Sequence, residues 1–309
     1  MGFSVRNVWA AAVSVLASSV FPIASVQARE PGVAPVMPPG ATMGIPVAAP
    51  LPDGVYVNML TSYYGVQLKD NSGHFSGLDG TAIDPALQVI WVPGFELFGA
   101  KYKAYILQPT LYMTQTRSSP FPPPLRGDAS SYTNANIQIQ PIDLSWTLAP
   151  GLFFNAGFSV FAPTGQWGLN DPINAGASFW TFAPNFALTY LHDGWNYSLQ
   201  GWYYTNTENS VSRYRSGNEV MFDATITKDI GGINVGPVAY YYKQVSQDWN
   251  FGASYGGSVS GDAEKYAVGG AISARIGDVN VLMMYTHDVY IRNTVGGGKA
   301  WLTFSFKIF

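Results

Sequence analysis

Two stretches of the sequence decide the fold: WNYSLQGWYY, residues 195–204, and EVMFDATIT, residues 219–227. In both stretches polar and apolar residues alternate, which predicts β-strands with one polar and one apolar face. The polar faces hold Asn196, Ser198 and Gln200 in the first stretch, and Glu219, Asp223, Thr225 and Thr227 in the second. The rest of the chain indicates what covers each face.

The composition indicates a largely apolar surrounding. Of 309 residues, 47% are hydrophobic and only 11% are charged, whereas about 25% are charged in typical soluble domains. Such a chain would have difficulty keeping a water-facing surface free of large apolar patches. The mean hydropathy is nevertheless only +0.07, because uncharged polar residues are finely mixed with apolar ones. The net charge of −3 argues against nucleic acid as a partner, and the absence of cysteine excludes disulfides and thiol chemistry.

The first 53 residues divide into two segments. Residues 1–28 have the features of a signal peptide: the basic residue Arg6, an apolar run, and a small-residue cleavage site ending at Ala28. A retained membrane anchor is the less favoured alternative, since no positive stop-transfer cluster follows. Residues 29–53 are rich in Pro, Ala and Gly and lack periodicity. We expect them to form an extended periplasmic lead or a plug in a lumen.

Residues 54–309 carry a recurrent strand pattern. No stretch has a sustained helical period, and none reaches the ~18 apolar residues of a membrane-spanning helix. Segments rich in Tyr, Val, Phe, Ile and Thr are separated by clusters of Gly, Pro, Asn and Asp. The twelve predicted strands lie at about 54–67, 83–93, 99–113, 136–147, 152–162, 178–191, 195–206, 218–230, 233–246, 264–276, 279–291 and 299–309.

The connections between these segments alternate in length. Those after even-numbered segments are short, whereas those after odd-numbered segments are mostly longer, at 68–82, 114–135, 163–177, 207–217, 247–263 and 292–298. This parity is typical of a transmembrane antiparallel β-barrel of about twelve strands, with short periplasmic turns and longer extracellular loops. Hydrocarbon offers no partner to backbone N–H and C=O groups, so a barrel must close. The sequence therefore predicts an all-β protein of the bacterial outer membrane, with lipid around its apolar face.

Alternation also assigns residues to the lumen and to the membrane boundaries. The predicted pore-lining residues are Lys101, Lys103, Asp143, Glu219 and Asp223. Charges of both signs favour a weakly selective interior. An aromatic girdle is predicted from tryptophans beside the short turns and the longer loops, namely Trp91, Trp146, Trp180, Trp195, Trp249 and Trp301. Twelve strands lie between the filled eight-stranded and the open sixteen-stranded barrels, which predicts a narrow passage or ligand cavity.

No catalytic chemistry emerges from the motifs. The histidines are His74, His192 and His287, and neither HExxH nor GxSxG occurs. No serine on an apolar face lies beside a histidine with a polar orienting partner, as a lipid hydrolase would need. We expect no enzyme activity, no cofactor and no metal.

From residue 152 the chain resembles a known family. The resemblance rests on FSVFAPTGQW (158–167), NAGASFWTFAPNFALTYL (174–191) and YYTNTENSVSRYRSGNEVMFDAT (203–225), with a similar lead at 38–64. The family is that of outer-membrane transporters named for the meta-cleavage pathway of phenol degradation. It implies an outer-membrane barrel that takes up small hydrophobic or aromatic compounds. The alternatives are a general diffusion porin, a lipid-modifying barrel enzyme, or a barrel without transport.

The segment KAWLTFSFKIF, residues 299–309, predicts the strand that closes the barrel onto residues 54–67. The resemblance implies that Phe309 belongs to the signal read by the barrel-assembly machinery. Phe309 is out of phase with the apolar residues Leu302, Phe304, Phe306 and Ile308. Either the strand bulges near Lys307 or the signal is atypical.

Overall fold

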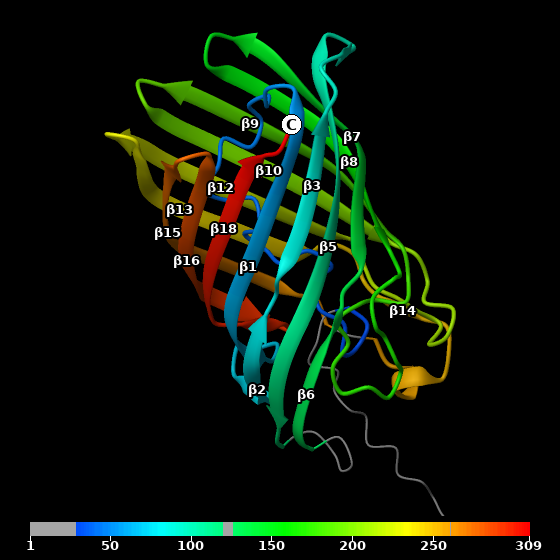
Figure 1. Cartoon of the computed structure of the whole chain (residues 1–309). Coiled ribbons are helices and arrows are strands. Elements are labelled where there is room, and N and C mark those ends of the chain that lie inside the picture. The colour runs from blue at the N-terminus through cyan, green and yellow to red at the C-terminus, as the bar shows by residue number, and fades with distance from the viewer. Residues whose placement is uncertain (1–28, 120–125, 260) are drawn as a thin grey trace, which may run out of the picture.

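The fold is a closed antiparallel β-barrel. The structure is a computed structural model that describes residues 29–119, 126–259 and 261–309, so the predicted signal peptide lies outside the described residues. Within these ranges twelve strands form the wall, as the sequence predicts (Figure 1). Helices of the described residues are all too short or too polar to cross a membrane.

The wall strands are antiparallel to their neighbours throughout. They are β1 (Gly54–Lys69), β2 with β3 (Phe75–Ile83, Ala86–Val92), β5 (Ala100–Arg117), β6 with β7 (Gly127–Asn134, Ile137–Ala149), β8 (Leu152–Ala162), β9 (Thr181–His192), β10 (Trp195–Asn206), β12 (Glu219–Ile230), β13 (Ile233–Gln244), β15 (Glu264–Ile276), β16 (Val279–Arg292) and β18 (Gly298–Lys307). Short elements lie between them: β4 (Glu96–Leu97), β11 (Tyr214–Arg215), β14 (Trp249–Asn250), the 3-10 turn η1 (Ser254–Gly257) and β17 (Val295–Gly296).

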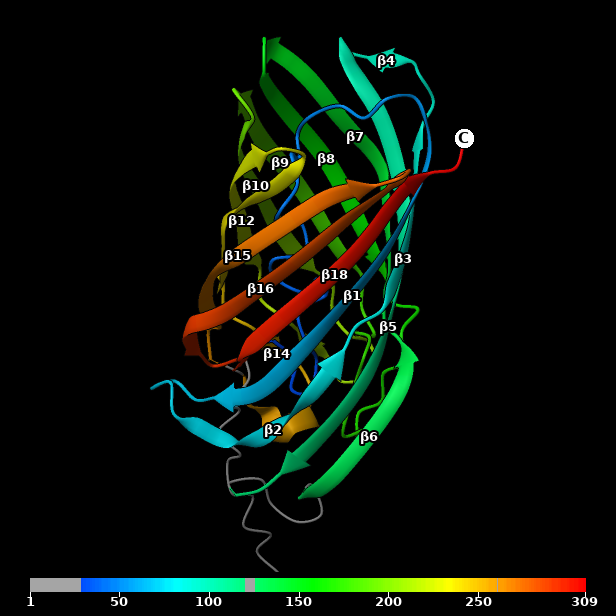
Figure 2. The ribbon, with the colours of Figure 1, turned by 60° about the vertical axis from the view of Figure 1, so that its left-hand side comes forward.

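Pairing of β18 with β1 closes the barrel. The register runs from Lys307 opposite Tyr56 to Lys299 opposite Tyr64. Tight turns gather at one end, near the C-terminus, and the longer connections with β14 gather at the other (Figures 1 and 2). By the parity of the connections these are the periplasmic and extracellular ends.

Two regions predicted as loops are strands instead. Most of 68–82 belongs to β1 and β2, and most of 114–135 belongs to β5 and β6. The sequences of β2 and β6 are rich in Gly, Ser, Asp and Asn, which favour turns, but pairing with β1 and β5 overrides this preference. Each of these strands is interrupted once, at Asp84–Pro85 and at Ala135–Asn136. Among the described residues, β6 pairs with β5 alone.

The two faces of the wall separate as alternation predicts. On β10 and β12, the polar residues Gln200, Asp223 and Thr225 are at most 3% exposed, toward the lumen. Their neighbours Leu199 and Ile226 are more than 40% exposed, toward the membrane. An apolar outer face matches lipid, while the polar inner residues need partners inside the barrel.

An irregular pairing of the last residues explains why Phe309 departs from the alternation of apolar and polar residues. Strand β18 ends at Lys307, and the next N–H, from Ile308, donates to the Val55 carbonyl at 2.8 Å. The Val55 N–H donates instead to the Phe309 carbonyl at 3.1 Å. Two residues therefore oppose one, as in a β-bulge, and the extra residue shifts the alternation.

Replacing Leu199 by arginine tests the assignment of the outer face. We expect Leu199→Arg to destabilise the barrel by about 2–4 kcal/mol, because it places a charge in the hydrocarbon region. Ile230→Arg, beside a periplasmic turn, should change stability by about 0–1 kcal/mol. Urea titrations in lipid vesicles measure both values, and equal effects would contradict the assignment.

Candidate functional site

Residues 29–53, called the lead below, lie inside the barrel. The lead starts near the extracellular loops and reaches β1 at the periplasmic end (Figures 1 and 2). Met37, Met43 and Ala48 are 8%, 1% and 0% exposed. Its many prolines have no N–H and cannot continue a sheet. Some of the remaining N–H groups donate to carbonyls within the lead, as Ala41 does to Pro38, and others donate to polar side chains of the wall.

The inner face of β12 supplies most of these partners. The Asp223 carboxylate accepts hydrogen bonds from the Gly40 N–H at 3.1 Å, the Thr42 N–H at 3.1 Å and the Thr42 hydroxyl at 2.7 Å. Next along the strand, Thr225 Oγ1 accepts from the Gly44 N–H at 2.9 Å. Hydrogen bonds to a charged acceptor are about twice as strong as neutral ones, so Asp223 is the main polar anchor of the lead.

Glycine is required at the turn that Asp223 binds. Gly40 and Gly44 have φ angles of +93° and +80°, a conformation that other residues adopt at a cost. A Cβ at Gly44 would lie 2.7 Å from Leu282 Cδ1, and one at Gly40 would lie 3.1 Å from the Tyr240 ring. The lead therefore contacts β13 and β16 closely through its backbone.

A second anchor lies at the extracellular end. Arg29 Nη1 lies 3.1 Å from Glu219 Oε2, and both side chains are 1% exposed. The next residue, Glu30, accepts hydrogen bonds from Asn209 Nδ2 at 3.0 Å and from the Tyr255 hydroxyl at 2.9 Å. Burial raises the pKa of the Glu30 carboxyl, and these hydrogen bonds act in the opposite direction. The lead is thus tied to the loops around β11 and η1.

Apolar packing fills the spaces between the polar anchors. Met37 lies in a cluster with inward residues of β8, β9, β10, β12 and β13, including Phe161 and Trp202. Met43 lies in a second cluster with residues of β13, β15, β16 and β18, including Trp301. Methionine adapts to irregular gaps, so both residues suit a segment without regular structure.

The loop that follows β8 supports the start of the lead. This loop carries the Pro-Thr-Gly motif, and the buried Asn136 side chain binds its backbone at Gly165 and Ala177. Asn174 then pairs with Val33 of the lead in a parallel bridge, and the Phe179 ring lies 5.8 Å from the Arg29 guanidinium. The family motif therefore has an architectural role.

The five predicted pore-lining residues lie in three separate places. Glu219 and Asp223 bind the lead. Asp143 belongs to a network on the wall, 3.6 Å from Lys103 Nζ, and accepts a hydrogen bond from Gln140 at 2.7 Å. Lys101 is 37% exposed at the periplasmic end, where it binds Asp53 at 2.7 Å. The structure does not bring them together along one passage.

The predicted girdle tryptophans are placed differently from one another. The side chains of Trp91, Trp180, Trp195 and Trp249 are 39–51% exposed, and Trp146 is partly buried, with its indole N–H bound to the Phe98 carbonyl. Trp301 is only 7% exposed and packs against the lead. The girdle assignment of Trp301 is wrong because the alternation that turns Leu302 outward turns its neighbour inward.

An apolar cavity of about 120 Å³, called the chamber below, lies between the lead and the wall. Its apolar lining comes from the lead, β1, β2 and β5, and includes Pro35, Val66, Leu78, Ala82, Leu111 and Met113. Lys265 and Lys299 also line it. Sequence reasoning missed both lysines, although alternation with Tyr266 and Ala300 could have placed them on the inner face.

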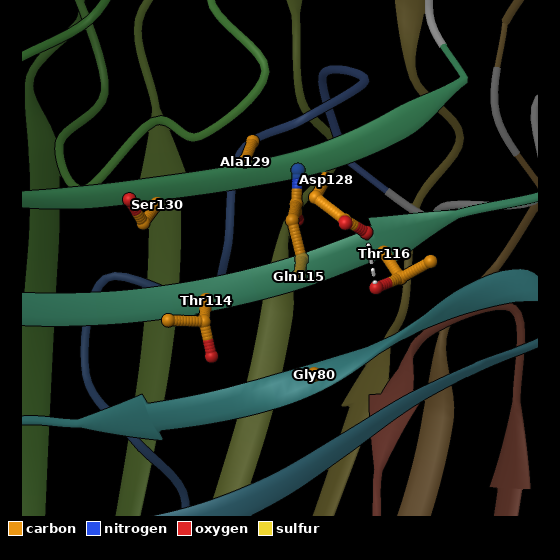
Figure 3. Close-up of a pocket in the computed structure, with 7 residues that line it drawn as sticks. All are labelled: Gly80, Thr114, Gln115, Thr116, Asp128, Ala129 and Ser130. Carbon is orange, nitrogen blue, oxygen red and sulfur yellow. Dashed lines mark hydrogen bonds between the residues drawn. The ribbon is translucent and has the colours of Figure 1, made fainter.

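A second depression, of about 300 Å³, lies between β2, β5 and β6 (Figure 3). It is open to solvent, and Thr116 Oγ1 donates to Asp128 Oδ1 at 2.7 Å across its rim. It is separate from the lead and contains no cluster of charges. The chamber is more enclosed and borders the lead, so it is the better candidate site.

Comparison with known protein families identifies the family of this chain. The model of the family described as "Putative MetA-pathway of phenol degradation" matches residues 66–304. The chain belongs to this family. A search of curated proteins gives no match.

A solved outer-membrane channel shows the same fold, and two other solved barrels have lower TM-scores. The COG4313 outer membrane channel from Pseudomonas putida F1 has a TM-score of 0.70 and 15% identity, over 84% of this chain and 97% of that chain. A mutant of the TodX monoaromatic hydrocarbon channel has a TM-score of 0.42 and 9% identity, over 82% and 90%. The Bordetella autotransporter BrkA β domain has a TM-score of 0.45 and 14% identity, over 83% and 100%. The protein is a β-barrel of the bacterial outer membrane.

Removal of the Asp223 carboxylate should loosen the lead. The chain has no cysteine, so Met43→Cys introduces a single thiol at a position that is 1% exposed. We expect Asp223→Ala to raise the rate at which a water-soluble maleimide labels this thiol by about tenfold or more, because three hydrogen bonds to a charged group are lost.

Asp143→Ala is the matched control, since Asp143 is also a buried inward carboxylate but binds only wall residues. It should leave the labelling rate within about twofold. Equal labelling rates in the two backgrounds would contradict the anchoring role of Asp223.

Proposed function

We propose that the protein is an outer-membrane channel for the uptake of small hydrophobic or aromatic compounds, with the lead as its movable plug. The observation that carries this proposal is the apolar chamber between the lead and the wall. Ligand sites are typically enclosed, mostly apolar cavities with a few placed polar groups. The chamber has this character, and it lies toward the end of the barrel where a solute from outside would enter.

Filling of the lumen argues against a general diffusion porin. Such a porin needs an open aqueous passage, whereas inward residues of the wall, including Phe161, Met221 and Tyr242, are at most 1% exposed. The lead covers these side chains and satisfies the carboxylates beside them. Passage of a solute therefore requires the lead to shift, which favours selective uptake over free diffusion.

The three histidines are exposed, and none of them lines the chamber. His287 lies on β16 with its side chain on the outer face, and His74 lies in the exposed β1–β2 connection. His192 is 62% exposed at a periplasmic turn, beside Asp193. Among the described residues, no three His, Cys, Asp or Glu side chains are grouped so that they could hold a metal ion.

A disulfide between the lead and β9 tests the plug. The Ala48 N–H lies 3.0 Å from Thr189 Oγ1, so Ala48→Cys with Thr189→Cys brings two thiols together in a chain without other cysteines. We expect the reduced protein in liposomes to take up labelled benzyl alcohol faster than empty vesicles and to exclude arabinose. Oxidation should reduce the aromatic flux to the level of empty vesicles, since the lead can no longer leave.

Thr189→Cys alone is the control and should be insensitive to oxidation. An aromatic flux equal to that of empty vesicles would contradict the channel function. Uptake of arabinose at the aromatic rate would favour the diffusion porin.

A further inference from the structure

Two buried lysines line the chamber. Lys265 of β15 and Lys299 of β18 are 2% and 4% exposed. Their Nζ atoms lie 5.4 Å and 5.0 Å from the centroid of the same ring, that of Tyr64. The two ammonium groups therefore flank one tyrosine on one side of the chamber.

The protein compensates these charges incompletely. Lys265 Nζ donates to the Tyr64 hydroxyl at 3.3 Å and to the Val295 carbonyl at 3.1 Å, which are neutral acceptors. In the described part of the chain, no carboxylate forms an ion pair with Lys265 within 4.0 Å. Lys299 Nζ lies 3.6 Å from Asp84 Oδ2, which also accepts a hydrogen bond from Ser62 Oγ at 2.9 Å.

Asp288, the other carboxylate of this region, is already occupied. It accepts hydrogen bonds from the Tyr64 hydroxyl at 3.1 Å, from the Tyr240 hydroxyl, and from the Gly297 N–H at 2.9 Å. It therefore lies behind the tyrosines and does not line the chamber. The chamber lining holds the cations Lys265, Lys299 and Arg117 and a single carboxylate, Asp84.

We infer that the chamber binds aromatic carboxylates, with the ring on the apolar lining and the carboxylate on Lys265 and Lys299. This inference rests on the proposed channel function and specifies its substrate class. An ammonium group can only donate hydrogen bonds, and charge-assisted bonds to a carboxylate are the strongest it makes. A neutral hydrocarbon would leave Lys265 without an ion pair and Lys299 with Asp84 as its ion-pair partner in a largely apolar surrounding, which is unfavourable.

The volume of the chamber fits one ring. At about 120 Å³ it is close to the roughly 150 Å³ apolar cavity that holds benzene in an engineered protein. Val66, Leu78 and Ala82, which line the chamber and form one apolar cluster with Tyr64, provide the surface for the ring. Tyr64 thus adjoins both the apolar surface and the two lysines. A ligand with an aromatic ring and a carboxylate needs these two surfaces side by side.

Calorimetric titration of the full-length barrel in detergent tests the inference with benzoate and benzyl alcohol, which share a ring and differ in charge. We expect benzoate to bind about tenfold or more tightly than benzyl alcohol, because only benzoate pairs with the buried cations. In the double variant Lys265→Met, Lys299→Met this preference should disappear, with benzyl alcohol binding within about twofold of its original value. Lys243→Met, outside the chamber lining, should leave both affinities unchanged.

Each variant is first shown to be a folded barrel by its heat-modifiable migration in gels. If the double methionine variant does not fold, the double Lys→Arg variant is compared with Lys299→Gln. The double arginine variant should retain the preference for benzoate, and Lys299→Gln should weaken it. Equal affinities for the two compounds in the native protein, or an unchanged preference after neutralisation, would overturn the inference. Uptake of benzyl alcohol with no preference for benzoate would overturn the inference alone, whereas failure of both compounds to cross would overturn the channel function as well.

Discussion

The need to pair every backbone polar group determines the architecture at two levels. In hydrocarbon the wall can satisfy its N–H and C=O groups only by closing, which the pairing of β18 with β1 achieves. Closure of twelve strands leaves a lumen too wide for side chains alone to fill. The lead fills it. Because its prolines prevent a regular sheet, its N–H groups bond partly to carbonyls within the lead and partly to inward side chains such as Asp223 and Thr225.

The lead and the chamber are two consequences of the same packing. Where β12 offers carboxylates and hydroxyls, the lead is held by hydrogen bonds, and where β8, β10 and β13 offer aromatic side chains, it is held by Met37. Toward β1, β2 and β5 the contact is incomplete, and the chamber remains. A plug anchored on one side and loosely packed on the other is suited to shift when a solute enters the loose side.

Much of the fold could be predicted from the sequence because a barrel wall has a simple rule. Strict alternation, as in residues 219–227, and the alternating lengths of the connections identify a twelve-stranded barrel without knowledge of tertiary contacts. The rule fails where pairing with neighbouring strands overrides the local preference for turns. This happens in β2 and β6, whose glycines and polar residues predict loops. The same alternation turns Leu302 outward and therefore places Trp301 inside the barrel, not in the girdle. The site was less predictable. Alternation shows that Glu219 and Asp223 face inward, but it does not show that the lead binds them there. It also does not show that Lys265 and Lys299 lie beside the same ring, that of Tyr64.

Planar-bilayer recording tests whether the lead closes the lumen. Single-channel conductance would be compared between the full-length protein and a variant that lacks residues 29–48 but keeps residues 1–28 and β1. We expect low or absent conductance for the full-length barrel and a steady conductance at least severalfold higher for the shortened one. Equal conductance in the two proteins would contradict it, because the passage would then lie elsewhere than along the path of the lead.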